Sequence, residues 1–342
     1  MKTEIFEIKS SDDEKIQIAG KALREGKLVA IPTETVYGLA ANALDEKAVR
    51  SIFAAKGRPS DNPLIVHISR LEQWDFLVEK IDERAKLLAE KFWPGPLTII
   101  LKKSDIVPEA TSGGLKTVAV RMPSHPIARA IIEASGVPLA APSANTSGKP
   151  SPTTAKHVEK DLFGKIDYIV NGGDCSVGVE STVITLATEK PTLLRPGGIT
   201  PEMLEAVLGD IEISDSVFNK LSEDSEAASP GMKYQHYSPK AKIVIVKADE
   251  ERYCSFLSEV ADEKTVALCF EEDKEKLSFV KTVVYGKEKD SFSQASSLFD
   301  SLRQVDEVGA EIAYARFPEM SGVGLAVFNR LIRAAAFNII EV

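Results

Sequence analysis

Residues 45–68 read DEKAVRSIFAAKGRPSDNPLIVHI and contain a helix, a polar loop and a strand in succession. Asp45 can cap a helix whose apolar residues recur at helical spacing and which ends at Lys56-Gly57. The apolar run at 63–68, after the loop, is typical of a buried strand. This order of elements indicates the α/β class, in which ligands bind in loops at the carboxyl ends of strands.

The same alternation extends in both directions from this stretch. Up to residue 210 we expect strands at 28–31, 63–68, 97–101, 118–122, 138–141, 168–170, 182–186 and 192–194. Helices are expected there at 15–26, 45–56, 82–92, 125–134, 154–163 and 201–208. Because strands follow one another late in this part, the pattern predicts a twisted mixed sheet rather than a purely parallel one.

The length of 342 residues indicates about two domains, at roughly 150 residues each. We place the first domain at 1–210, a linker at 211–240 and a smaller doubly wound α/β domain at 241–342. In the last we expect strands at 243–246, 266–270, 280–285 and 311–317, with helices at 250–260, 292–305 and 324–336. The linker contains MKYQHYSP, whose aromatic side chains indicate a contact rather than a free spacer.

The composition is that of an ordinary globular protein, with 44% hydrophobic and 27% charged residues. The longest apolar runs are far shorter than the roughly 20 residues of a membrane helix, and the amino terminus lacks a secretory signal. Cys175, Cys254 and Cys269 are widely separated and odd in number, which suggests neither a disulfide framework nor a zinc site. We therefore expect a cytoplasmic protein without membrane contact.

The formal charge of −9 arises from 42 basic and 51 acidic residues that are unevenly distributed. Residues 1–210 contain 26 Lys and Arg against 28 Asp and Glu, whereas residues 211–342 contain 16 against 23. This balance argues against a surface covered with nucleic-acid-binding charge. A polyanionic ligand would more readily bind the first part, if its basic residues gather in one cleft.

Five polar loops lie at the ends of predicted strands in the first part. They read PTETVYG (32–38), KGRPSDNP (56–63), PSANTSGKPSP (142–152), GVESTV (178–183) and LRPGG (194–198). The sequence contains no P-loop, dinucleotide-binding loop, HExxH or GxSxG pattern. Together the loops indicate an anion-binding cleft. Its candidate cations are Lys56, Arg58, Arg121 and Arg195.

Each of these features also has a structural interpretation. Loop 32–38 can be a simple turn with a capping threonine. Lys56 can stabilise the end of its helix, or it can bind a polyphosphate together with Arg58. His67 can be a core histidine that is hydrogen-bonded to backbone. Arg121 ends a buried strand and needs an anionic partner, either a structural Asp or Glu or a ligand carboxylate.

Taken in this order, the loops resemble the YrdC-type threonylcarbamoyl-AMP synthase family. The matching strings span nearly all of residues 20–205 and read PTETVYGL, KGRPSDNPL, FWPGPLT, VAVRMPSHP, PLAAPSANTSGKPSPT, GVESTVI and LRPGGIT. The segment SPGMKYQHYSPKA and the α/β tail resemble the long two-domain form of that family. This implies a YrdC-like catalytic domain at 1–210, a linker over the active site at 211–240 and an accessory Rossmann-like domain at 241–342.

The resemblance implies an activity, a set of ligands and partners. L-threonine, bicarbonate and ATP would give L-threonylcarbamoyl-AMP and pyrophosphate, for threonylcarbamoyladenosine modification of tRNA next to the anticodon. The enzyme would be a cytoplasmic nucleotidyltransferase that uses Mg²⁺ carried by ATP, without protein side chains as metal ligands. A downstream tRNA threonylcarbamoyl transferase would take over the product, and any RNA contact would be weak or indirect.

The resemblance also implies roles for individual residues. Threonine would be bound by Thr35, His67, Arg121, Ser181 and, through its backbone, Ala141. ATP would be bound by Lys56, Arg58, Asn62, Thr117, Ser143, Ser151, Arg195 and His236. Lys56 and Arg58 would be the catalytic cations, and Tyr234 and Tyr237 would belong to a lid that excludes water.

The implied chemistry agrees with the absence of paired acids or a nucleophilic triad. A carbamate oxygen would attack the α-phosphate of ATP, so positioning and charge neutralisation would supply most of the rate. Two alternatives remain for the cationic loops. They could form a module that reads double-stranded RNA by shape, or the site of a transferase that uses ready-made carbamoyl phosphate.

Overall fold

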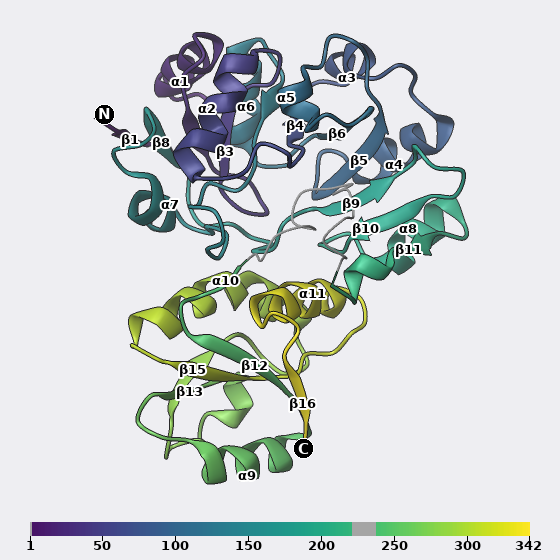
Figure 1. Cartoon of the computed structure of the whole chain (residues 1–342). Coiled ribbons are helices and arrows are strands. Elements are labelled where there is room, and N and C mark those ends of the chain that lie inside the picture. Colours follow the sequence, from purple (N-terminus) through teal and green to yellow (C-terminus); the bar gives the residue numbers. More distant parts are fainter. Residues whose placement is uncertain (1, 221–236) are drawn as a thin grey trace.

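The computed structural model describes residues 2–220 and 237–342, which form two α/β domains (Figure 1). Each domain contains one β-sheet, and the second domain is the smaller. The predicted lid residue Tyr234 and the predicted ATP ligand His236 lie outside the described residues, whereas Tyr237 is described. In the described ranges, no helix is both long and apolar enough to cross a membrane.

The sheet of the first domain is mixed. Its strands are β1 (Glu4–Glu7), β2 (Val29–Ile31), β3 (Gly38–Asn42), β4 (Ile65–His67), β5 (Leu97–Lys102), β6 (Thr117–Arg121), β7 (Leu139–Ala140), β8 (Tyr168–Asn171), β9 (Thr182–Thr185), β10 (Thr192–Arg195) and β11 (Glu212–Ile213). Among the described residues the order is β1-β8-β2-β3-β7-β4-β6-β5-β9-β10-β11. At its centre β4 runs parallel to β6 and antiparallel to β7, so the prediction of a mixed sheet is confirmed.

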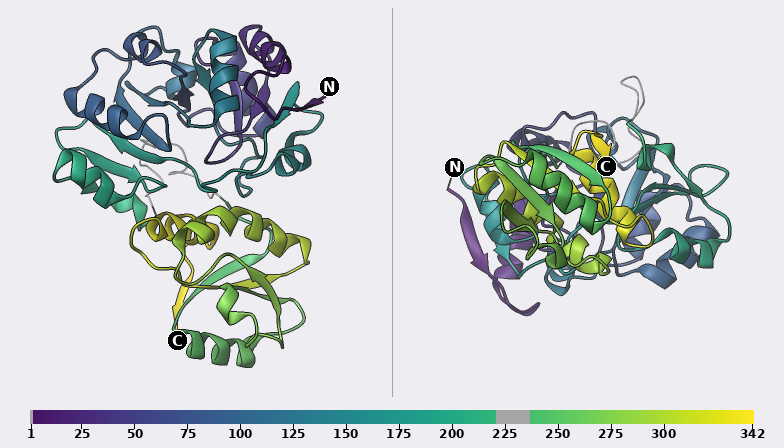
Figure 2. Two further views of the ribbon diagram at one scale, coloured as in Figure 1. Left: turned by 180° about the vertical axis from the view of Figure 1, so that it is seen from behind. Right: turned by 90° about the horizontal axis from the view of Figure 1, so that it is seen from below.

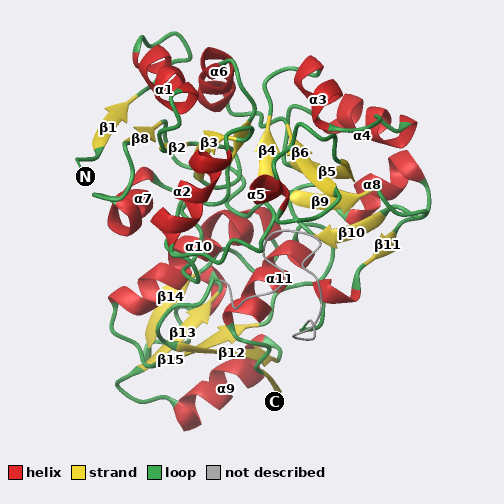
Figure 3. Ribbon diagram, turned by 45° about the horizontal axis from the view of Figure 1, so that its top comes forward, coloured by secondary structure: helices red, strands yellow, loops and turns green. Residues whose placement is uncertain are grey.

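Helices surround this sheet (Figure 3), and their buried apolar residues belong to its hydrophobic core. They are α1 (Lys15–Arg24), α2 (Glu46–Lys56), α3 (Glu72–Leu77), α4 (Glu83–Phe92), α5 (Glu109–Ser112), α6 (Pro126–Ser135), α7 (Ala155–Leu162) and α8 (Pro201–Leu208). The Asp45 carboxylate caps α2 by accepting from the backbone N–H of Lys47 and Ala48, as predicted. Gly57 ends α2 in the left-handed conformation at φ 62°, so Lys56 is its last residue.

The sheet of the second domain is parallel throughout. Its strands are β12 (Lys242–Lys247), β13 (Thr265–Cys269), β14 (Lys281–Val284), β15 (Ile312–Arg316) and β16 (Ile339–Glu341), in the order β14-β13-β15-β12-β16. The helices are α9 (Glu250–Val260), α10 (Ser291–Glu307) and α11 (Gly324–Ala334). The parallel sheet with helices on both faces confirms the predicted doubly wound domain.

Two helices of the second domain form its contact with the first. Figures 1 and 2 show α10 and α11 between the second sheet and the first domain, whereas α9 lies on the opposite face of that sheet. Residues of α11 are buried along the whole helix, which agrees with packing on both sides. This arrangement brings polar side chains of α10 and α11 to the loops of the first domain.

Several elements differ from the sequence-based expectation. Strands β1, β3 and β16 were not predicted, and β11 falls within the range assigned to the linker. Strand β3 has the sequence GLAAN, which contains only small or polar residues apart from one leucine. It pairs antiparallel with β2 and β7, and so it fills the position between them in the sheet.

Candidate active site

A polar pocket lies where the loops of the first domain meet. It is lined by Thr33, Thr35, Val36, Gly38, Lys56, Arg58, Ile65, His67, Arg121, Ala141, Pro142, Ser143, Asn145, Ser147, Gly148, Lys149, Ser151, Glu180, Ser181, Arg195 and Tyr237. The pocket therefore brings together residues from all five polar loops of the sequence. The four predicted cations therefore line one pocket, although the first domain has almost no net charge.

Two of the candidate residues lie side by side at adjacent strand ends. His67 ends β4 and Arg121 ends β6, and the two are directly paired in the parallel register of these strands. Because the strands are parallel, both side chains are placed at the same carboxyl edge of the sheet. The register of the central sheet thus positions this part of the pocket.

The guanidinium of Arg121 has a carboxylate partner within the protein. Its Nη2 lies 2.6 Å from Oε1 of Glu34, and both side chains are buried. It also donates to the hydroxyl of Thr35 at 2.9 Å and to the carbonyl of Gly95 at 3.3 Å. Of the two partners that the sequence left open for Arg121, the described residues supply the structural one, and Arg121 still lines the pocket.

His67 is buried and neutral. Burial, aided by the nearby charge of Arg121, lowers the pKa of His67 to about 3. Its Nδ1 lies 3.2 Å from the carbonyl oxygen of Ile65, an atom that can only accept. Nδ1 must therefore hold the proton, which leaves Nε2 as a hydrogen-bond acceptor on a residue that lines the pocket.

The ammonium of Lys56 is surrounded by oxygens of the 143–145 loop. Nζ donates to the carbonyl of Ser143, to the carbonyl of Asn145 at 2.6 Å and to the side-chain oxygen of Asn145 at 3.3 Å. These three oxygens are all uncharged, so none of the three contacts is an ion pair. Burial and the neighbouring Arg58 lower the pKa of Lys56. Lys56 therefore shapes the loop in addition to its predicted role toward phosphate.

Ser181 and Arg195 form a second polar group in the pocket. The guanidinium of Arg195 donates to the backbone carbonyl of Ser181 at 3.1 Å and to its hydroxyl at 3.2 Å. The Ser181 hydroxyl is also 2.8 Å from that of Thr98. Burial and nearby Arg330 lower the pKa of Arg195 to about 10, which keeps it charged at neutral pH. The pocket therefore presents a fixed cation next to an oriented hydroxyl.

Other predicted residues have different placements. Ala141, Ser143 and Ser151 line the pocket, whereas Asn62 and Thr117 do not. Thr117 lies at the opposite end of β6 from Arg121. Asn62 is buried, and neither its amide nitrogen nor its amide oxygen has a hydrogen-bond partner in the described part of the chain.

Tyr237, a predicted lid residue, is buried and stacks on α10. Its ring centroid lies 5.1 Å from that of Phe299, and the guanidinium of Arg330 lies 5.9 Å from the same ring. Its backbone has a φ of 64°, which is unusual for a residue other than glycine. The end of the linker is thus held by the second domain next to the pocket.

Two acids and one amide that shape the pocket were not assigned a role from the sequence. Glu34 supports Arg121, Asn145 accepts from Lys56, and the carboxylate of Glu180 accepts from the Ser151 hydroxyl at 2.6 Å. All three stand in the quoted polar loops, which was the available signal. The three partners just named lie 29 to 89 residues away in the chain, so the pairing was not visible in the sequence.

The fold and this pocket define a class: a two-domain α/β protein whose mixed-sheet domain has a pocket lined by several cationic side chains. The Sua5/yciO/yrdC family model, described as "Telomere recombination", matches residues 21–197. A second model, "Threonylcarbamoyl-AMP synthase, C-terminal domain", matches residues 199–336.

Full-length relatives agree with the two models. A threonylcarbamoyl-AMP synthase of Pyrococcus abyssi is 48% identical over 96% of both chains. One of Bacillus subtilis is 46% identical over 97% of this chain and 96% of that protein. The crystal structure of P. abyssi Sua5 complexed with L-threonine superposes with a TM-score of 0.89 at 46% identity over all of both chains. This chain belongs to the threonylcarbamoyl-AMP synthase family of enzymes.

Proposed function

We propose that this enzyme converts L-threonine, bicarbonate and ATP into L-threonylcarbamoyl-AMP and pyrophosphate, for threonylcarbamoyladenosine modification of tRNA. The observation that supports this most strongly is the juxtaposition of His67 and Arg121 with the cationic loops. The pocket contains groups suited to an amino acid, His67 and Arg121, together with cations suited to a polyphosphate, among them Lys56 and Arg58. The P. abyssi protein crystallised with L-threonine supports the amino-acid assignment.

In this proposal Arg121 binds the threonine carboxylate. Glu34 and the Thr35 hydroxyl fix the orientation of its guanidinium, so that little reorganisation is needed when the ligand binds. The acceptor Nε2 of His67 would receive a hydrogen bond from the threonine hydroxyl or ammonium. A methyl group alone discriminates between ligands by only about 1–3 kcal/mol, so polar groups such as these would provide specificity for threonine.

The phosphates of ATP would meet Lys56, Arg58 and Arg195. The threonine nitrogen bonds to the carbon of bicarbonate-derived carbon dioxide and loses a proton, and a carbamate oxygen then bonds to the α-phosphorus. The bond from that phosphorus to the bridging oxygen breaks, and pyrophosphate leaves. Cations around the pocket would stabilise the charge that builds up on the phosphates, in the way common to phosphoryl transfer.

Magnesium would enter as the counterion of ATP. In residues 2–220 and 237–342, no three His, Cys, Asp or Glu side chains gather as metal ligands would. Glu180, a carboxylate in the pocket lining, is engaged by Ser151 and Arg330. A metal held chiefly by phosphate oxygens and water fits this arrangement.

Product analysis tests the proposal. The purified enzyme would be incubated with Mg-ATP, L-threonine and ¹³C-bicarbonate, and the product would be identified by mass spectrometry. We expect threonylcarbamoyl-AMP with one ¹³C atom. An unlabelled carbamoyl group, or product formed only when carbamoyl phosphate is supplied, would instead favour the carbamoyl-phosphate-dependent transferase.

A further inference from the structure

We propose that Arg303 and Arg330, two arginines of the second domain, are positioning residues for the ATP site, because together they fix segment 148–151 of the first domain. This inference rests on the proposed function, since Ser151 is a proposed ATP contact. Gly148, Lys149 and Ser151 all line the pocket. The segment contains Pro150 and lies in a loop, so its position depends on the side chains that hold it.

Arg330 acts on segment 148–151 through the carboxylate of Glu180. Its side chain is fully buried on α11, and its Nε donates to Oε2 of Glu180 at 2.7 Å. The other carboxylate oxygen of Glu180 accepts from the Ser151 hydroxyl at 2.6 Å. Burial would raise the pKa of Glu180, but Arg330 and Arg195 outweigh it and lower the pKa, so that the carboxylate is ionised. The orientation of Ser151 thus depends on an arginine 179 positions further along the chain.

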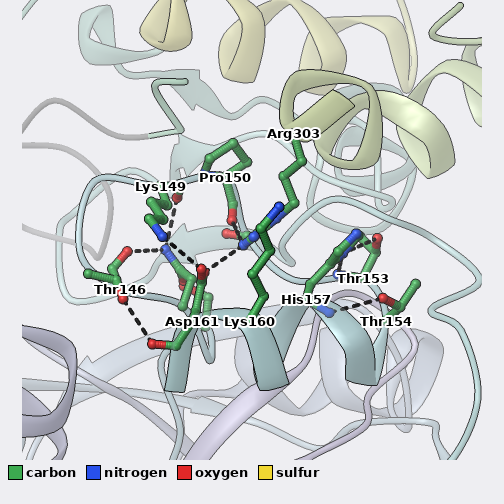
Figure 4. Close-up of polar contacts among 12 residues, drawn as sticks. Thr146, Lys149, Pro150, Thr153, Thr154, His157, Lys160, Asp161 and Arg303 are labelled. Atoms are coloured by element: carbon green, nitrogen blue, oxygen red, sulfur yellow. Dashed lines mark hydrogen bonds and ion pairs between the residues drawn. The ribbon is translucent and has the colours of Figure 1, made fainter. Parts of the chain in front are cut away.

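Arg303 holds the same segment from α10, as Figure 4 shows. Its Nη2 donates to the carbonyl of Pro150 at 2.5 Å and to the buried carboxylate of Asp161 at 2.8 Å. Asp161 also accepts from Nζ of Lys149 at 3.0 Å. Two consecutive residues, Lys149 and Pro150, are therefore fixed by one arginine of the second domain, directly and through Asp161.

Two backbone contacts support the same docking. The N–H of Ser238, at the end of the linker, donates to the carbonyl of Gly148 at 2.9 Å. Gly178 has a φ of +80°, and a Cβ there would collide with the backbone of Ala295 and Ser296 on α10. The loop that contains Glu180 therefore touches α10 directly. The second domain contacts both loops that place Ser151.

These contacts predict a specific consequence for ligand binding. Without Arg330, Glu180 would be a buried carboxylate without its main charge partner, and it would no longer hold Ser151 in one orientation. Without Arg303, the carbonyl of Pro150 would lose its hydrogen bond, while the ion pair between Asp161 and Lys149 would remain. The part of the pocket around Ser151 would loosen, whereas His67 and Arg121, at the ends of β4 and β6, would keep their positions. ATP binding should therefore suffer more than threonine binding.

The test compares three full-length variants, Arg330→Gln, Arg303→Gln and the matched control Arg333→Gln. Arg333 is also buried on α11, but it donates to the carbonyl of Ser216, away from segment 148–151. The Kd of Mg-ATP and the Kd of L-threonine would each be measured by calorimetry, and amide exchange of peptides covering 146–152 would be measured by mass spectrometry. Melting temperatures report the general loss of stability.

We expect Arg330→Gln and Arg303→Gln to raise the Kd of ATP at least tenfold and that of threonine less than threefold. Both should speed amide exchange in 146–152, whereas Arg333→Gln should lower the melting temperature only. If all three variants melt earlier but bind ATP within twofold of wild type, the inference is wrong. Should Arg330→Gln not fold, Arg303→Gln decides. If wild type itself binds no ATP, the proposed function fails, and amide exchange alone decides the inference.

Discussion

The guanidinium of Arg121 lies 2.6 Å from the carboxylate of Glu34, and the two form a buried ion pair at the edge of the pocket. The pair satisfies the charge of Arg121 when no ligand is bound. It also fixes the direction of the guanidinium, whose other donors meet Thr35 and Gly95. In our account Glu34 is the permanent partner, and the threonine carboxylate is an additional one.

Removing Arg121 should weaken threonine binding selectively. Arg121→Ala alone would leave Glu34 as a buried unpaired charge, so we would combine it with Glu34→Gln. We expect the double variant to raise the Kd of threonine at least tenfold and that of ATP less than threefold, as measured by calorimetry. Arg129→Ala, on the exposed face of α6, is the control. Equal losses for both ligands would place Arg121 elsewhere in the site.

Glu34→Gln should change stability in a pH-dependent way. Burial would raise the pKa of Glu34, but the charge and hydrogen bond of Arg121 outweigh it and lower the pKa. The resulting stabilisation is fully present above the unfolded pKa of about 4.3, and it is lost as pH falls through the lowered folded value. Urea unfolding should show wild type more stable by about 1–3 kcal/mol at pH 7. The difference should shrink below about pH 4, and a constant difference would contradict this.

His67 should not titrate in the physiological range, because its pKa in the folded enzyme is about 3. The unfolded chain, with a pKa of about 6.5, binds one more proton between these two values, so stability rises with pH across that window. The ring resonances of His67 should stay constant from pH 8 to pH 5 in NMR spectra. His67→Gln should reduce the pH dependence of unfolding in the same window. A midpoint for His67 near pH 6.5 would show that its ring is accessible and charged.

Lys56→Met should loosen the loop that Lys56 holds. The substitution keeps the apolar stem but removes all three hydrogen bonds to Ser143 and Asn145. We expect a loss of about 2–3 kcal/mol in unfolding free energy and faster amide exchange in 143–147. Lys47→Met, an exposed position on the same helix, should have little effect on either quantity. Unchanged exchange in 143–147 would contradict the role of Lys56 in the loop.

Much of the fold follows from local patterns in the sequence. Asp45 and Gly57 mark the ends of α2, and the apolar run 63–68 contains β4, because caps and periodicity act over a few residues. Strand β3 was not predicted, since GLAAN shows neither alternation nor β-branched residues. It forms because β2 and β7 flank it, a tertiary effect that a local pattern does not contain.

The sequence likewise indicated some features of the site and not others. The five polar loops contain most of the residues that line the pocket, since polar loops next to the strands of an α/β sheet commonly hold its ligands. The long-range pairs were not predictable, because Arg121 and Glu34 lie 87 positions apart, and Arg330 lies 150 positions from Glu180. The sequence contains one sign of the role of Arg330, because this arginine stands among apolar residues in the segment that forms α11. In the structure every residue of α11 is buried.

Pyrophosphate release shows most directly whether the enzyme makes threonylcarbamoyl-AMP from threonine, bicarbonate and ATP. It would be measured with Mg-ATP and the full-length enzyme, with L-threonine and bicarbonate supplied together and singly in carbonate-depleted buffer. We expect rapid release only when both are present, because the carbamate must form before it attacks the α-phosphate. Release at the full rate with either one alone, or no release with both, would contradict this expectation.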